Sequence, residues 1–527
     1  MLTVNNDQQV GRVGARIHEY LAGRQAWNRR LWGVGSALAI RELVEAIEES
    51  RNGTLSEEAV SYLANAASVE LGPDAGAGDP AQRRLAQETL RKRPLRPNSL
   101  ATSTLRAILG DIDQNYLIRW RDAAHEARIG SVERTARSIA AHLLDAGFSS
   151  SFLVEWWGGR LAPHTAAITL ADLFDQASTL VRQPETTFAA LIAFDSLARA
   201  LPRTASGWMS GRDVVTWLRT RGHDTNGLRV HGGLLYSIPA RDSFAAAEVV
   251  RERVDQLLAR AALGTNKPVH VVDRIWIEGC SAAFAVARPP RGVAVHSLER
   301  EGLVIERPSH EKTESAIELL GVMNSGPPGA AVASGWAAIE SLLLGAGEGV
   351  ERVAAADRMA DVVSCSFPRA ELTTLGYRHS ENSADELAVA IRGATDNRDR
   401  ARLVAKHLIA GHRLSLRSIA DVAAEERLLS ILKNPAKGVS DVRNHIQQAA
   451  RRLYRQRNLV MHGGVRSVAL SSCLRTGAAL VGACLDRIIH ALFAEKVEPL
   501  DLAARAGRKL AVLQHRLPVE VTDLLEA

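Results

Sequence analysis

A predicted helix ends in the stretch Tyr454-Arg455-Gln456-Arg457-Asn458-Leu459-Val460-Met461-His462-Gly463-Gly464. Apolar and basic faces alternate along this helix, and the paired glycines are a natural stop signal. Residues three or four apart share a helix face, so Asn458 and His462 are expected on one side, with Arg455 beside them. Arg457 comes five residues before His462 and points roughly 140° away in an ideal helix. Its long side chain therefore has to curl toward the histidine or reach across to a partner subunit.

These residue types suit one reaction. The 2′-hydroxyl of an RNA attacks its own adjacent phosphate when a base removes the hydroxyl proton and a cation holds the developing negative charge. Histidine titrates in the right range for the first task, and arginine serves the second. The sequence therefore predicts a reaction that needs no metal.

The spacing alone does not identify the site. Arg-x4-His also occurs at Arg137/His142, Arg291/His296 and Arg402/His407. The plain alternative is that His462 caps a helix or packs in a core. Context separates Arg457/His462 from these three pairs. Only there is the arginine followed by asparagine, the interval filled by apolar residues and the helix closed by Gly-Gly.

The pattern Arg-Asn-x-x-x-His-Gly at 457–463 resembles the HEPN superfamily, especially the branch found in bacterial antiviral defence proteins of the Apea-like kind. A second element agrees with it. The segment Ser334-Gly335-Trp336-Ala337-Ala338-Ile339-Glu340-Ser341-Leu342-Leu343 is similar to the first helix of those domains, which often carries an aromatic and an acidic residue before a leucine pair. The resemblance covers about 312–495, with a longer insertion between the two elements than minimal HEPN domains have.

The resemblance implies roles for the matching positions. His462 is the expected general acid/base, Arg457 is expected to steady the scissile phosphate, and Asn458 to orient the phosphate or the histidine. Around them, substrate contact is predicted for Arg455 and Tyr454, with helix solvation as the alternative. Glu340 is expected to support the site or to be an ordinary helix-surface residue. HEPN ribonucleases usually act as dimers whose two motifs face each other.

The rest of the chain predicts a mainly α protein. Helical periodicity dominates a predicted N-terminal region, 1–205, and a small α+β module is expected at 206–311. Its strands are predicted at 228–230, 234–238, 269–277, 282–287 and 293–295, around a helix at 243–262. The HEPN-like helical bundle is predicted at 312–495, and a helical tail at 496–527.

Composition limits the function classes. The net charge of +6 and the pI near 9.3 come largely from arginine, which suits phosphate contact but also follows from genome base bias. No apolar run of about 18 residues and no signal peptide is present, so a soluble, cytoplasmic protein without membrane contact is expected. The four cysteines fit neither a disulfide framework nor a zinc site and are predicted to be buried thiols. Because no glycine pair is followed by Lys-Ser/Thr, no nucleotide-hydrolysing loop and no cofactor are predicted.

The sequence thus favours a metal-independent endoribonuclease that acts as an effector of anti-phage defence and leaves a 2′,3′-cyclic phosphate. RNA, a second copy of the chain in a homodimer or higher homo-oligomer, and a phage-derived trigger or regulatory partner are the expected partners. The first two regions are then sensor or regulatory parts. Two alternatives stay open: a non-catalytic RNA-binding or dimerising scaffold with HEPN helices, and a DNA-binding regulator.

Overall fold

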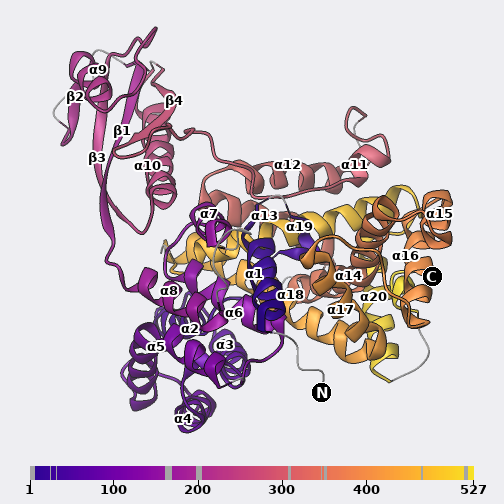
Figure 1. Cartoon of the computed structure of the whole chain (residues 1–527). Helices are drawn as coiled ribbons and strands as arrows, with labels where there is room; N and C mark the ends of the chain where they lie inside the picture. Colours follow the sequence, from indigo (N-terminus) through magenta and orange to yellow (C-terminus); the bar gives the residue numbers. More distant parts are fainter. Residues whose placement is uncertain are drawn as a thin grey trace.

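The protein is mainly helical, as the sequence predicts. Its computed structural model describes residues 6–23, 25–30, 32–126, 128–160, 169–197, 205–266, 268–306, 310–345, 347–348, 353–464, 467–515 and 520–526. Within these ranges the chain forms a helical N-terminal region, a small antiparallel sheet with two helices, and a helical C-terminal domain (Figure 1).

The N-terminal region packs its helices around one apolar core. Side-chain caps define several helix starts: Ser56, Asp79, Ser99 and Ser131 each accept a hydrogen bond from a backbone N–H of the first turn. The helices are α1 (Asn6–Leu21), α2 (Ser36–Arg51), α3 (Glu57–Leu71), α4 (Pro80–Arg91), α5 (Leu100–His125), α6 (Val132–Asp145), α7 (Ser150–Arg160) and α8 (Leu170–Arg182).

The α+β module begins earlier than predicted. Its four strands lie in the order β2-β3-β1-β4 and all pair antiparallel, so the predicted boundary at 206 is wrong and β1 belongs to the module. The elements are β1 (Thr186–Ser196), β2 (Trp208–Ser210), α9 (Gly211–Thr220), β3 (Gly232–Ala240), α10 (Ser243–Gly264) and β4 (His270–Ile277). The module projects away from the helical body (Figure 1).

Strand β1 is buried on both faces, with Ile192 in the core shared with α10 and Leu191 in the core shared with α9. A continuous apolar run of this kind has no period of two, so periodicity cannot distinguish it from a buried helix. The strands predicted at 228–230 and 293–295 do not form, and the one at 282–287 is reduced to a single bridge between Ile275 and Phe284. The predicted helix 243–262 and the strand at 269–277 are confirmed.

The C-terminal domain has a second apolar core, in which Trp336 is buried. The final helix lies against α14 in this core, with Leu502 and Ala506 inside it, so the predicted tail is part of the domain. The helices are α11 (Ser297–Arg300), α12 (Glu311–Ser325), α13 (Pro328–Leu343), α14 (Val353–Asn382), α15 (Glu386–Gly393), α16 (Asn397–Ile409), α17 (Ile419–Lys433), α18 (Pro435–Asn458), α19 (Leu470–Phe493) and α20 (Pro499–Gln514).

One helix in the described part of the chain, α19, is long and apolar enough to cross a membrane. Within its most apolar window, 78% of the residues are buried inside the protein. The core helix of a soluble protein has the same character. Of the cysteines, Cys365, Cys473 and Cys484 are buried thiols as predicted, whereas Cys280 is partly exposed and none forms a disulfide.

The N-terminal region and the C-terminal domain are packed tightly against each other. Helix α1 contacts α17, and the buried carboxylate of Glu371 on α14 accepts a hydrogen bond from Asn28 at 2.9 Å and pairs with Arg29 at 2.5 Å. Leu459, at the end of α18, is buried in the N-terminal core. The segment that contains the predicted site therefore lies where the two regions meet.

Candidate active site

A change of helix type occurs at the predicted site. Helix α18 ends at Asn458 and is followed by a π-helical turn, Leu459–Gly463, whose end is marked by Gly464 with a φ of 57°. The Gly464 N–H bonds the carbonyl of Leu459, five residues back. Such a wide turn places residues i and i+5 above each other, which an α-helix does not.

The π turn brings the predicted catalytic groups together. Arg457 Nη1 lies 3.2 Å from His462 Nε2 and donates a hydrogen bond to Asn458 Oδ1 at 3.0 Å. Of the two possibilities left open for Arg457, the curl toward His462 within one chain is the one that occurs. The wide turn favours it because a π-helix rotates less per residue than an α-helix and so brings residue i+5 nearer to residue i. All three side chains form one contiguous group within a single chain.

His462 is exposed to solvent, and Arg457 and Asn458 are half-buried beside it. A guanidinium has only donors, so in its hydrogen bond with Arg457 the Nε2 atom of His462 is the acceptor and the ring proton is on Nδ1. This neutral imidazole is the form that accepts a proton. An anion bound to the same guanidinium would free Nε2 to accept a proton from another donor.

The other three Arg-x4-His pairs do not form this contact. Arg137 and His142 lie on different faces of α6, and His142 is buried against Tyr116 with ring centroids 4.1 Å apart. Arg291 binds the carbonyls of Met323 and Gly326. Arg402 pairs with Asp523, while His407 contacts the carbonyl of Arg413. The only pair of the four that is joined by a hydrogen bond in the described structure is the one on the π turn.

The predicted substrate contact of Arg455 is contradicted. Its side chain is 7% exposed and pairs with Glu42 of α2 at 3.4 Å, so it faces the N-terminal region and not the surface beside His462. Burial lowers the pKa of Arg455. Arg455 and His462 are seven residues apart and would share one face of an ideal α-helix. The π turn changes the rotation between them, so they do not share a face here.

The positions of Tyr454 and Glu340 also do not match their predicted roles. The Tyr454 ring is half-buried against Trp336 of α13, with centroids 4.8 Å apart, so packing accounts for its position. Helix α13 approaches the π turn at its beginning, where a Cβ on Gly329 would lie 3.4 Å from Val460. Glu340 is eleven residues further along α13, about 16 Å at the rise of an α-helix. It is therefore distant from His462.

Three comparisons with known proteins found no match. No protein-family model, no curated protein and no solved structure matches it. The resemblance to HEPN proteins thus rests on the two sequence elements. In the described residues no group of three or more His, Cys, Asp or Glu side chains is arranged to hold a metal ion.

Two carboxylates of α2, which the sequence did not single out, hold the motif in place. Glu42 forms a bidentate pair with Arg452 at 2.7 and 2.8 Å, and Glu45 accepts hydrogen bonds from the Ser467 hydroxyl at 2.6 Å and the Val468 N–H at 3.2 Å. The motif is therefore fixed from both sides by one helix of the N-terminal region. These partners are more than 400 residues apart in the chain, so no local pattern indicates them.

The Glu42 pair is deeply buried. Burial raises the pKa of a carboxyl, but Arg452 and Arg455 outweigh it here and hold the pKa of Glu42 below its usual value. The carboxylate is thus charged and matched by two guanidinium groups. Such a pair contributes a defined register to the contact between α2 and α18, since removing one partner would leave an uncompensated buried charge.

Proposed function

We propose that this protein is a metal-independent endoribonuclease that cleaves RNA by transesterification. The observation that supports it is the hydrogen bond of 3.2 Å between Arg457 Nη1 and His462 Nε2, formed at a solvent-exposed position. It joins a proton acceptor and a phosphate-binding cation in one unit. The role as an effector of anti-phage defence, with a phage-derived trigger, comes from the HEPN resemblance alone, and the cytoplasmic location is proposed from the sequence composition.

The proposed reaction begins when a non-bridging phosphate oxygen binds Arg457. The Nε2 atom of His462 takes the proton of the 2′-hydroxyl, and the 2′-oxygen attacks the adjacent phosphorus. The bond from phosphorus to the 5′-oxygen breaks, and that oxygen leaves with a proton from an acid. The products are a 2′,3′-cyclic phosphate and a 5′-hydroxyl. Arg457 balances the extra negative charge of the five-coordinate intermediate.

The leaving oxygen needs a proton donor at the moment the hydroxyl loses its proton. His462 is the one imidazole at this site in the described chain, and it is occupied as the base. A second copy of the motif, facing the first across a homodimer, would supply the acid. The proposed active form is therefore a homo-oligomer with two motifs at each scissile phosphate.

The test is cleavage of a single-stranded RNA by the full chain with EDTA present, followed by analysis of the product ends. We expect a 2′,3′-cyclic phosphate from the wild type and no detectable product from His462→Ala or Arg457→Ala. His296→Ala changes another exposed histidine of an Arg-x4-His pair and should keep full activity. RNA that binds without being cut would support the scaffold alternative, and cleavage that survives both site variants would refute the proposed site.

A further inference from the structure

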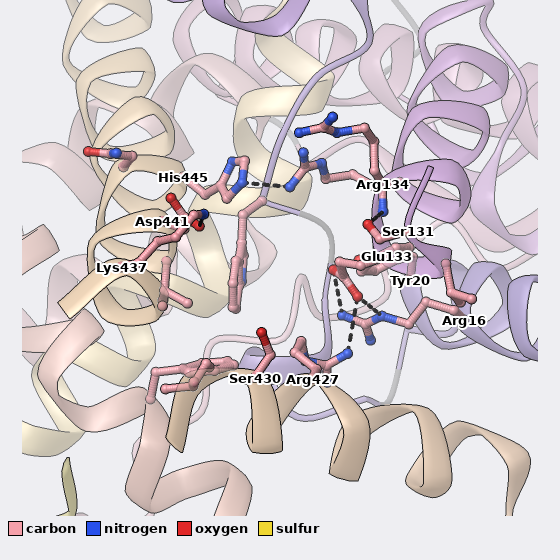
Figure 2. Close-up of a pocket in the computed structure, with 18 of the residues that line it drawn as sticks. Arg16, Tyr20, Ser131, Glu133, Arg134, Arg427, Ser430, Lys437, Asp441 and His445 are labelled. Carbon is pink, nitrogen blue, oxygen red and sulfur yellow. Dashed lines mark hydrogen bonds and ion pairs between the residues drawn. The ribbon is translucent and has the colours of Figure 1, made fainter. Parts of the chain in front are cut away.

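A cavity of about 560 Å³ lies between the N-terminal region and the C-terminal domain, away from His462. Its walls come from α1 and α6 on one side and from α17 and α18 on the other (Figure 2), and Trp32 is also among the residues that line it. The volume is in the range of sites that enclose small organic ligands. It exceeds what an inorganic anion alone would fill.

The cavity has an excess of positive charge, with six cationic side chains and four carboxylates in its lining. Three of these carboxylates are already engaged. Glu133 pairs with Arg16 at 2.8 Å and with Arg427 at 3.1 Å. Asp441 pairs with Lys437 at 2.6 Å, and Glu426 pairs with Arg12, which lies outside the lining, at 3.0 Å.

Three arginines of the lining have no carboxylate partner in the part of the chain that the structure describes. Arg30 donates to the carbonyl of Arg291 at 2.9 Å, and burial lowers its pKa. Arg137 donates a hydrogen bond to the Nε2 atom of His445 at 2.6 Å and is among the charges that lower the pKa of Glu133, and Arg134 is exposed. Guanidinium groups that form no ion pair favour an anionic ligand, and their geometry favours a phosphate.

His445 keeps Arg137 in place without neutralising it. Because Arg137 can only donate, the imidazole accepts through Nε2 and is neutral. Burial, together with the nearby charges of Arg137 and Arg134, lowers the pKa of His445 to about 3. The ring is therefore uncharged at neutral pH, and the positive charge of Arg137 stays available.

Aromatic side chains line the same cavity. Trp32 is half-buried, and the Phe367 ring packs behind it with centroids 5.3 Å apart, which fixes the indole in position. A fixed indole stacks well on a flat ring, and nucleobases offer such a ring. Glu70, which has no ion pair in the described structure, provides an acceptor for hydroxyl or amino groups.

We propose that this cavity is a binding site for a nucleoside phosphate. The phosphate would contact Arg137, Arg30 and Arg134, and the base would stack on Trp32. No glycine-rich phosphate loop is involved, so this is binding by arginine side chains without hydrolysis. The proposal concerns binding only and stands whether or not the His462 site cleaves RNA.

The experiment is calorimetric titration of the full chain with the four ribonucleoside 5′-monophosphates, the matching nucleosides and inorganic phosphate. At least one monophosphate should bind with a defined stoichiometry, and its nucleoside and inorganic phosphate should each bind at least about tenfold more weakly. Arg134→Gln at the exposed rim, which should leave the fold intact, and Arg137→Gln should both weaken binding about tenfold or more. Arg128→Gln, a highly exposed arginine just before α6, is the matched control and should change nothing.

Three results would overturn the proposal. The first is no saturable binding of any monophosphate. The second is equal affinity for inorganic phosphate, which would make the cavity a plain anion site. The third is evidence that the ligand lies outside this cavity, given either by unchanged affinity in both arginine variants or by loss of binding in His462→Ala.

Discussion

Two arginine–histidine pairs lie in different surroundings, one between α6 and α18 and the other on the turn that follows α18. Arg137 donates to His445 at 2.6 Å inside the interdomain cavity, and Arg457 lies 3.2 Å from His462 at the surface. Burial makes the first histidine a neutral fixed acceptor with a pKa of about 3, whereas the second is open to solvent. A hydrogen bond of the same kind therefore positions Arg137 in the first pair and leaves the imidazole of His462 available for proton transfer in the second.

The largest effect should come from comparing the two histidines in RNA cleavage. His462→Ala removes the proposed proton acceptor and should lower the cleavage rate by about 10²–10⁴-fold, the contribution typical of general acid–base catalysis. His445→Gln keeps an acceptor near Arg137 and should change the rate by less than about fivefold, which is roughly 1 kcal/mol. Single-turnover cleavage measures both. Equal losses in the two variants would remove the distinction between the pairs.

The next largest effect should come from Glu42, the buried carboxylate that holds the helix carrying Arg457 and His462 in place. Glu42→Ala leaves Arg452 and Arg455 without a counter-charge and should lower the free energy of unfolding by about 3–5 kcal/mol. Urea unfolding at pH 7.5 measures it. Glu88→Ala, an exposed carboxylate on α4, is the control and should stay within about 0.5 kcal/mol.

A double variant sharpens that prediction. If Arg455 acts through Glu42, the loss in Glu42→Ala/Arg455→Ala should be smaller than the sum of the two single losses. Additive losses, together with weaker RNA binding by Arg455→Ala alone, would restore the substrate contact that the sequence predicted.

The pair formed by Arg137 and His445 should also be visible in the pH dependence of stability. His445 has a folded pKa of about 3, below the ordinary value of about 6.5, so the unfolded chain binds more protons between these values. Stability is therefore complete above pH 6.5 and falls as the pH drops below it. Between pH 7.5 and 5.0 this histidine should account for about 1–2 kcal/mol of the loss. His445→Gln should flatten the profile by that amount, and an unchanged profile would mean that the imidazole is charged in the folded protein.

The smallest effect belongs to the glycine pair that closes the π turn. Gly464 has a positive φ, which costs a residue with a Cβ roughly 1 kcal/mol, whereas Gly463 lies within the helical turn. Gly464→Ala should therefore destabilise the protein by about that amount, and Gly463→Ala should be neutral or slightly stabilising. Thermal unfolding of the two variants side by side tests this. Equal effects would indicate that the turn ends elsewhere.

Local signals predicted much of this molecule. The helical periodicity and the Gly-Gly stop placed α18 and α13 nearly where they occur, and Arg457, Asn458 and His462 do form one group. The reason for their contact was not predictable, because a π turn differs from an α turn by one inserted residue and has no sequence signature that the chain displays. The 140° separation of an ideal α-helix does not apply on this turn, and the predicted curl of Arg457 toward His462 occurs.

The features that the sequence did not predict depend on contacts between residues that are far apart in the chain. Arg455 was expected at the substrate and instead pairs with Glu42, and Arg137 was grouped with His142 but contacts His445, 308 residues away. Strand β1 was missed because a strand buried on both faces lacks alternation. In each case the tertiary environment determined the outcome, and helix-face arithmetic on α18 or α6 alone could not supply it.

The central claim is that His462 takes a proton from a ribose 2′-hydroxyl beside Arg457, and one measurement tests it most directly. An RNA is prepared with a single 2′-deoxynucleotide immediately before a mapped scissile phosphate, and its single-turnover cleavage with EDTA present is compared with that of the unmodified strand. The account predicts that cleavage at that phosphate disappears while other sites are cut as before. Cleavage at the modified position at the original rate would contradict it.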